Sequence, residues 1–178
     1  MKEPIVPQFE ADAFIRWEEA QELRFELHHG FAVAFAGGTV DHDRIGFSLR
    51  KIFERLYPLP CRTFGSDVKV RVGVASLYYA DVGVFCETVN GDATIVDRPR
   101  AIAEVLSRST RAYDVVEKRA AYRAMTSVET YVIVHTEMRR IEVDTRSTNG
   151  RWRTDTYDDD EAYLNGQAFR LEEVYGRL

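Results

Sequence analysis

Residues 101–106 read AIAEVL, and residues 78–86 read YYADVGVFC. Both segments are almost uniformly apolar over the length of a strand, which predicts strands covered on both faces. Each segment nevertheless carries one acid, Glu104 in the first and Asp81 in the second. The two segments therefore predict the centre of a sheet and place two carboxylates within it.

The chain on either side predicts helices and further strands around this centre. Helices are expected at 11–22, 41–56 and 111–125, and strands at 24–29, 31–36, 66–72, 130–136 and 139–145. Gly30 separates the first two strands as in a hairpin, and Ser109 or Thr110 is the expected N-cap of the third helix. The last thirty residues predict short strands and then a helical turn at 171–175. Because strands outnumber helices, the predicted class is α+β, with helices packed on a mixed central β-sheet.

Length and composition predict one domain over residues 1–178. With 45% hydrophobic and 12% aromatic residues, the chain has enough apolar side chains for a core and is not a disordered segment. No apolar run reaches the roughly 18 residues of a membrane span, and the N-terminal residues lack the apolar stretch of a signal peptide. We therefore expect a soluble, cytoplasmic protein of bacterial type without a membrane partner. Cys61 and Cys86 provide neither a disulfide framework nor a four-ligand zinc site.

The charge balance limits the mode of nucleic-acid binding. The formal net charge is −5, from 24 basic and 29 acidic residues. This argues against a tight, non-specific nucleic-acid binder, which is usually strongly basic. A nucleic-acid enzyme needs only a local basic rim around an acidic metal site, so that class stays open.

Asp81 and Glu104 are the first candidates for chemistry. A carboxylate in a covered strand costs several kcal/mol unless it is paired or binds a metal. Two converging carboxylates on separate strands would offer oxygen ligands to a hard cation such as Mg²⁺. The alternative is that each acid lies at a strand end in water or pairs with an arginine.

Lys118 is the second candidate. At about 100° per residue, it shares one face of the predicted third helix with Val115, Tyr122 and Met125, so this face should point at the sheet. A buried lysine needs a partner, and Glu104 lies on the strand just before this helix. A lysine is also a compact charge that can hold a water molecule or a phosphate oxygen. The alternatives are a snorkelling side chain or an i,i+4 pair with Asp114.

The remaining polar motifs are less specific. Glu26 alternates with apolar neighbours and faces the same way as His28, which is most often the pattern of a solvent-facing strand acid. His42 precedes the second helix and is expected as a capping or surface residue. The four histidines lack metal-ligand spacing, and neither a nucleophile elbow nor a phosphate-binding loop is present.

Five motifs in order resemble the Uma2 family of restriction-endonuclease-like proteins, within the PD-(D/E)XK nuclease superfamily. They are RFELHHG at 24–30, GSDVKVR at 65–71, YADV at 79–82, EVLSRST at 104–110 and DVVEK at 114–118. The resemblance covers nearly the whole chain and implies a restriction-endonuclease-like core, a mixed sheet flanked by helices.

The resemblance also implies roles for individual residues. Asp81 matches the metal-binding aspartate, Glu104 the second acidic ligand, and Glu26 the early acid that often completes the metal site. Lys118 matches a lysine moved from the strand to the following helix, because position 106 is leucine. The chain departs from the family pattern at four further positions, Ala80, His29, Phe31 and Arg108, and none of them removes a proposed ligand.

The expected activity is Mg²⁺-dependent (or Mn²⁺-dependent) hydrolysis of DNA phosphodiester bonds by an endonuclease. Asp81, Glu104 and Lys118 are the expected catalytic residues, and Asp81, Glu104 and Glu26 the expected metal ligands. Arg71, Arg108 and Arg111 would contact backbone phosphates. A homodimer is expected because a symmetric pair suits two cuts in a duplex. Two alternatives stay open: a catalytically idle interaction module on the same scaffold, and a metal-dependent hydrolase of another phosphoester.

Overall fold

The structure is a computed structural model that describes residues 8–34, 37–106 and 114–176. Its helices are α1 (Ala11–Glu18), α2 (Val40–Leu56), a π-helical turn (Asp114–Lys118) that leads into α4 (Arg119–Ala124), and α5 (Leu171–Tyr175). Its strands are β1 (Phe25–His28), β2 (Phe31–Ala34), β3 (Arg62–Gly65), β4 (Lys69–Arg71), β5 (Leu77–Tyr79), β6 (Val82–Phe85), β7 (Ile95–Val96), β8 (Ala101–Leu106), β9 (Thr130–His135), β10 (Arg140–Arg146), β11 (Trp152–Tyr157), β12 (Glu161–Leu164) and β13 (Gln167–Arg170).

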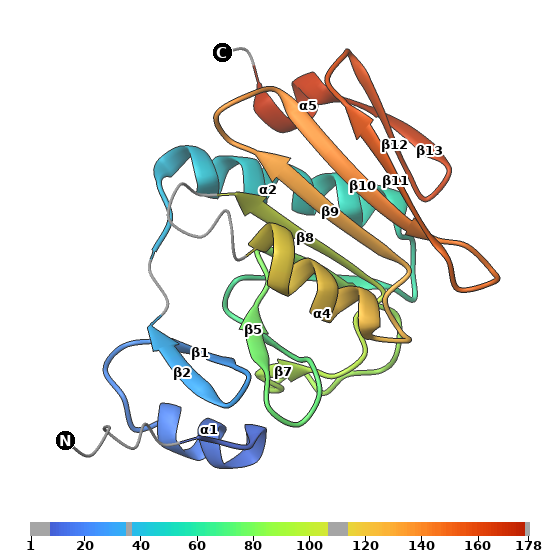
Figure 1. Cartoon of the computed structure of the whole chain (residues 1–178). Coiled ribbons are helices and arrows are strands. Elements are labelled where there is room, and N and C mark those ends of the chain that lie inside the picture. Colours follow the sequence, from blue (N-terminus) through green and yellow to red (C-terminus); the bar gives the residue numbers. More distant parts are fainter. Residues whose placement is uncertain (1–7, 35–36, 107–113, 177–178) are drawn as a thin grey trace.

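Two mixed sheets carry the fold, which confirms the predicted α+β class. The larger has the order β11-β10-β9-β8-β6-β3, and only β8 and β9 run parallel in it. The smaller has the order β2-β1-β5-β4-β7, and β12 pairs with β13 alone. Helix α2 covers one face of the larger sheet and α4 the other, as Figure 1 shows.

The apolar stripe of α2 fills the core on the first face. Its buried side chains pack on the apolar residues of β6, β8 and β9, together with α5 and the β12–β13 hairpin; they are Ile45, Leu49, Ile52, Phe53 and Leu56. Thr39 caps the helix, since its Oγ1 accepts a hydrogen bond from His42 N at 3.2 Å. The predicted helix at 41–56 is therefore confirmed, and Pro58 follows its end.

The second face of the larger sheet packs against the smaller sheet and α4. Ile102 and Ile133 come from the larger sheet, Tyr78 from the smaller sheet and Tyr122 from α4, and all four side chains are buried. Because residues 102, 104 and 106 share this face of β8, Glu104 points into the region between the sheet and α4. The fold thus directs one predicted site residue toward the helix that carries another.

The segment 78–86 differs from its prediction as a single strand. It divides into β5, which belongs to the smaller sheet, and β6, which belongs to the larger. Ala80 and Asp81 form the crossover, and the Asp81 carboxylate accepts a hydrogen bond from the backbone N–H of Val105 at 2.7 Å. Asp81 therefore continues the β6–β8 pairing with its side chain after the backbone ladder has ended at Val82 and Ala103.

One local prediction holds and two were too long. The hairpin of β1 and β2 turns at His29 and Gly30, both at positive φ, as a two-residue turn of the primed type requires. The first helix ends at Glu18, short of the predicted Glu22. The predicted strand at 66–72 is reduced to β4, because the chain turns at residues 66–68 before it.

The two cysteines form one bond that the sequence did not predict. Cys61 and Cys86 lie just outside the paired residues Arg62 and Phe85 of β3 and β6, and a disulfide joins them across the strand ends. Among the described helices, none is both long and apolar enough to cross a membrane.

Candidate active site

A buried lysine lies between two buried carboxylates in the space under α4. The Lys118 Nζ is 2.9 Å from Glu26 Oε1 and 3.6 Å from Glu104 Oε1. The three side chains are 6%, 7% and 3% exposed, and they come from the π-helical turn, β1 and β8. Three separate segments thus bring their charges together in the protein interior, where an ionised group is tolerated only when it is paired.

The helical surface predicted to face the sheet does so. Lys118 and Tyr122 are buried, and Val115 and Met125 pack partly buried against the same cluster. Lys118 is therefore not a snorkelling residue, and the side chain of its other predicted partner, Asp114, lies outside the described residues. The π-helical turn at 114–118 directly precedes α4, and such turns are frequent at functional sites.

Both oxygens of Glu26 are occupied. Oε1 accepts hydrogen bonds from Lys118 Nζ and from the backbone N–H of Tyr79 at 2.8 Å, and Oε2 lies 2.7 Å from His28 Nε2. Burial works to raise the pKa of Glu26, but the contacts with His28 and Lys118 outweigh it and hold the pKa below its usual value. Glu26 is thus a carboxylate that stays ionised inside the protein and holds Lys118 in place.

Asp81 lies at the crossover between β5 and β6, and its side chain is 10% exposed. Its Oδ2 accepts the hydrogen bond from Val105 N and also lies 3.3 Å from His42 Nε2. Asp81 borders a surface pocket of about 220 Å³ between α2 and the turn that follows β3, and His42, Arg50 and Asp67 line it as well. The pocket gives solvent and solutes access to the Asp81 side of the site.

Asp81 and Glu104 lie on neighbouring strands. The β6–β8 pairing joins Val82 to Ala103, and Asp81 and Glu104 are the next residues along it. The described residues hold no group of three or more His, Cys, Asp or Glu side chains arranged to bind a metal ion. Two carboxylates, completed by water and substrate oxygens, are nevertheless the usual protein contribution to a Mg²⁺ site. The donor set therefore fits a hard divalent cation.

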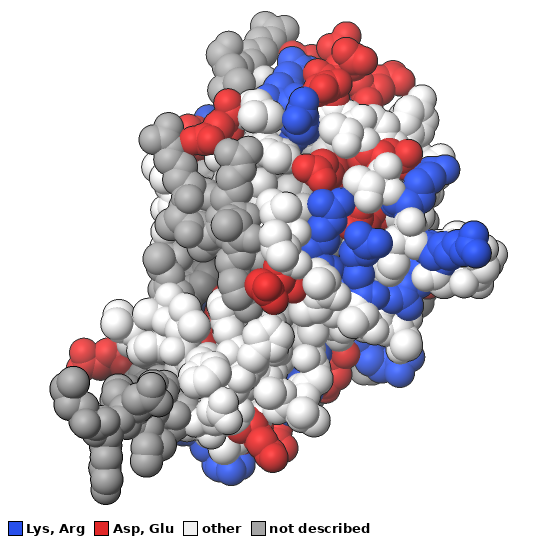
Figure 2. All heavy atoms as spheres, in the orientation of Figure 1, with Lys and Arg blue, Asp and Glu red and all other residues white. Residues whose placement is uncertain are grey.

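Of the three arginines predicted to bind phosphate, the structure describes Arg71. Arg71 is held by two carboxylates, with Nη1 2.8 Å from Asp12 Oδ1 and Nε 2.9 Å from Asp97 Oδ1. Its charge is thus balanced within the protein. Arg108 and Arg111 lie outside the described residues, as do the predicted N-caps Ser109 and Thr110. Figure 2 shows basic and acidic side chains interspersed on the face it draws.

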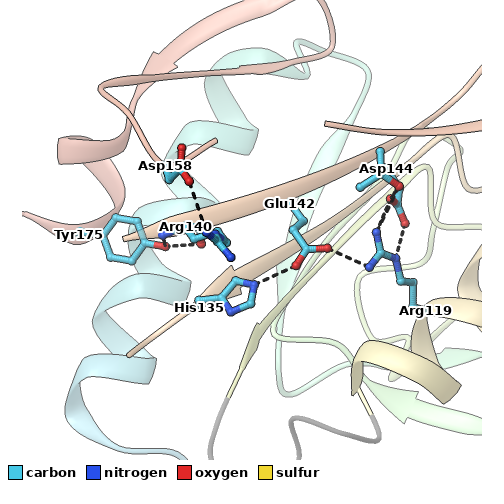
Figure 3. Close-up of polar contacts among 8 residues, drawn as sticks. Arg119, His135, Arg140, Glu142, Asp144, Asp158 and Tyr175 are labelled. Carbon is cyan, nitrogen blue, oxygen red and sulfur yellow. Dashed lines mark hydrogen bonds and ion pairs between the residues drawn. The ribbon is translucent and has the colours of Figure 1, made fainter. Parts of the chain in front are cut away.

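A second polar network fixes the helix that carries Lys118. Arg119 donates to both oxygens of the buried Asp144 at 2.7 and 2.6 Å, and to Glu142 Oε2 at 2.9 Å. Glu142 Oε1 in turn lies 3.0 Å from His135 Nε2, as Figure 3 shows. Arg119 follows Lys118 directly. Its ion pairs with Asp144 and Glu142 of β10 therefore fix the direction in which the Lys118 side chain leaves the helix.

Two residues of the site were missed from the sequence. His42 was expected as a capping or surface residue, yet its ring contacts Asp81. Tyr122 was expected only as a core residue, yet its buried hydroxyl has no hydrogen-bond partner within the described part of the chain. Burial, followed by the charges of Glu104 and Glu26, holds the pKa of Tyr122 well above its usual value. Its spacing of four residues from Lys118 was the available signal, whereas no local pattern links His42 to Asp81.

The fold is a mixed sheet flanked by helices, and its strands carry carboxylates beside a buried lysine. These features are those of the restriction-endonuclease-like class of proteins. Residues 11–173 match the Uma2 family, whose description is "Putative restriction endonuclease". The chain belongs to this family, which confirms the resemblance found in the sequence motifs.

The chain is also similar to two uncharacterized relatives and, in its fold, to one solved structure. An uncharacterized protein of Synechocystis sp., slr1290, is 28% identical over 97% of this chain and 94% of its own length. A second, sll1609, is 27% identical over 74% of this chain and 77% of its own. The fold is also similar to a crystal structure described as a putative nuclease belonging to DUF820 from Anabaena variabilis. That similarity has a TM-score of 0.74 at 14% identity and covers 94% of this chain and 97% of the other.

Proposed function

We propose that this protein is a metal-dependent endonuclease that hydrolyses DNA phosphodiester bonds. The observation that carries the proposal is the buried Lys118 ammonium beside Glu26 and Glu104. Asp81 lies at the start of the strand that pairs with β8. Its side chain also extends the β6–β8 pairing, and it adds a carboxylate that borders a solvent-accessible pocket. Family membership supports the nuclease class, and the acidic residues support a divalent cation.

Asp81 and Glu104 are the proposed ligands of Mg²⁺ or Mn²⁺, with Glu26 in support. When bound, the ion would lower the pKa of a water molecule and stabilise the charge that develops on the phosphate. Val105 N holds one Asp81 oxygen in a fixed orientation. Glu26 can reach a metal only by giving up one of its present contacts, so its main role is to hold Lys118.

Lys118 supplies the positive charge of the proposed reaction. Its ammonium would orient the attacking water or neutralise the scissile phosphate. Glu26 and the ring of Tyr78, whose centroid is 5.6 Å from Nζ, hold it in one place. A fixed charge stabilises a transition state better than a mobile one, because no reorganisation is needed during the reaction.

The proposed substrate contacts are local. With a net charge of −5, the protein would meet DNA through a limited basic rim, for which Arg108, Arg111 and Arg71 stay the proposed residues. Of these, Arg71 would have to exchange an acidic partner for a phosphate. A homodimer in the cytoplasm, each copy acting as one domain, completes the proposal and would suit cleavage of both strands.

Plasmid nicking in the presence of Mg²⁺ or Mn²⁺ tests the activity. Asp81→Asn, Glu104→Gln and Lys118→Met should each lower the nicking rate at least 100-fold. Asp67→Asn is the matched control, because Asp67 lines the same pocket but is 82% exposed and pairs with Arg24. Equal nicking by all variants would assign the activity to a contaminant and reject the proposed site.

The same preparations separate the alternatives. Cation binding without cleavage of any phosphoester would favour the idle interaction module. Hydrolysis of bis(p-nitrophenyl) phosphate by the wild type, with DNA left intact, would favour a hydrolase of smaller phosphoesters.

A further inference from the structure

His42 lies beside Asp81 and could offer a metal ion an imidazole nitrogen in addition to the carboxylate oxygens. It belongs to the first turn of α2, and its Nε2 is 3.3 Å from Asp81 Oδ2. The two side chains are 20% and 10% exposed, and both border the 220 Å³ pocket. The pair is thus sheltered but open to solutes on one side.

The backbone around His42 holds the imidazole in this position. Thr39 accepts the hydrogen bond from His42 N and fixes the start of the helix. A Cβ atom on Gly38 would lie 2.7 Å from His42 Nδ1 and 2.9 Å from its Cγ, so the ring rests against the bare Gly38 backbone. Any other residue at position 38 would have to displace the ring. The glycine therefore has a role in placing the imidazole.

The separation of the two donor atoms matches shared coordination. Ligands about 2.1 Å from an octahedral divalent ion lie about 3 Å apart in adjacent positions, which is close to the 3.3 Å between His42 Nε2 and Asp81 Oδ2. Asp81 is already fixed on its strand by Val105 N. An ion could therefore enter between imidazole and carboxylate with small side-chain movements.

We propose that His42 and Asp81 together bind the divalent ion of this site and that the imidazole gives it a preference for Mn²⁺ over Mg²⁺. The inference rests on the proposed function for the presence of a metal, and adds a ligand and a metal class to it. Mg²⁺ strongly prefers oxygen donors, whereas transition ions gain affinity from imidazole nitrogen. Asp43 at the same pocket adds negative charge that attracts a cation, whereas Arg50 is the basic residue of the lining.

Direct binding of MnCl₂ and MgCl₂ to the full chain, measured by calorimetry, tests the preference. His42→Gln should weaken Mn²⁺ binding at least tenfold and Mg²⁺ binding less than threefold, so that the ratio of the two affinities falls. His29→Gln is the matched control, because His29 is a histidine with a 67% exposed side chain and should leave both affinities unchanged. An unchanged ratio in folded His42→Gln would reduce the pair to a structural ion pair and overturn the proposal.

A second measurement is made on the wild-type protein, so its main result does not depend on whether His42→Gln folds. Electron spin echo spectra of Mn²⁺ bound to the wild-type protein should show modulation from a directly bound histidine nitrogen. Gly38→Ala should weaken or remove that modulation by displacing the ring. A wild-type complex without nitrogen modulation, or no Mn²⁺ binding at all, would overturn the proposal. Nitrogen-ligated Mn²⁺ in a protein that never cleaves DNA would keep this inference and reject only the nuclease function.

Discussion

The Nζ of Lys118 lies 2.9 Å from Oε1 of Glu26, although 92 residues separate the two in the chain. Removing one partner of a buried pair leaves the other charge without compensation, at a cost of about 3 to 5 kcal/mol. Lys118→Ala is therefore expected to lower the free energy of unfolding by about 3 to 5 kcal/mol, measured by urea denaturation.

The control for this prediction is another helical lysine. Lys51 lies exposed on α2, and Lys51→Ala should change the stability by less than about 0.5 kcal/mol. The double variant Glu26→Gln/Lys118→Met should recover part of the loss, since it removes both charges together. A Lys118→Ala protein as stable as the wild type would show that the ammonium is not buried.

The acid sensitivity of the fold follows from the lowered pKa of Glu26. Because the pKa is lower in the folded than in the unfolded chain, the ionised form stabilises the fold above the ordinary value of 4.5. This contribution is lost as the pH falls through the folded-state pKa. The difference in stability between wild type and Glu26→Gln should therefore be largest above pH 4.5 and shrink below it.

Urea denaturation in steps from about pH 5 to pH 3 measures this difference. The control Glu22→Gln replaces an exposed glutamate and should differ little from the wild type at every pH. A difference for Glu26→Gln that grows in acid would contradict the direction of the pKa shift.

The hydroxyl of Tyr122, which has no hydrogen-bond partner among the described residues, predicts a stabilising substitution. A buried donor without an acceptor loses the hydrogen bonds that water would give it. Tyr122→Phe removes only this hydroxyl and keeps the ring contacts with Tyr78 and Tyr131. The free energy of unfolding should rise by about 1 kcal/mol in thermal or urea denaturation. A loss of similar size would reveal an acceptor for the hydroxyl.

The bidentate ion pair between Arg119 and Asp144 predicts that lysine cannot replace arginine at position 119. Lysine has one ammonium in place of the planar guanidinium, so it cannot bind both Asp144 oxygens and Glu142 in the observed geometry. Arg119→Lys should cost about 1 to 3 kcal/mol in urea denaturation. The same exchange at Arg153, which is 75% exposed and pairs along its own strand, should cost less than about 0.5 kcal/mol. Equal effects at both positions would contradict an anchoring role for Arg119.

The crossover from β5 to β6 at Asp81 could not be predicted from the local sequence. The segment 78–86 is apolar apart from Asp81, so its pattern predicts one strand and does not indicate a change of sheet. The change occurs because Tyr79 and Val82 find different neighbours, β4 and β8, elsewhere in the chain. The same limit applies to His42, whose partner is 39 residues away, and to the bond between Cys61 and Cys86.

The sequence by itself determined the α+β class, the amphipathic helix α2, the hairpin at Gly30 and the choice of Glu104 and Lys118 as buried charges. These follow from periodicity and from the free-energy cost of burying a charge, both of which are properties of short segments. Only the tertiary structure decided that Glu26 holds Lys118, that Asp81 faces a pocket and that His42 joins it. Those relationships depend on which strands and helices become neighbours, and packing of the whole chain sets that choice.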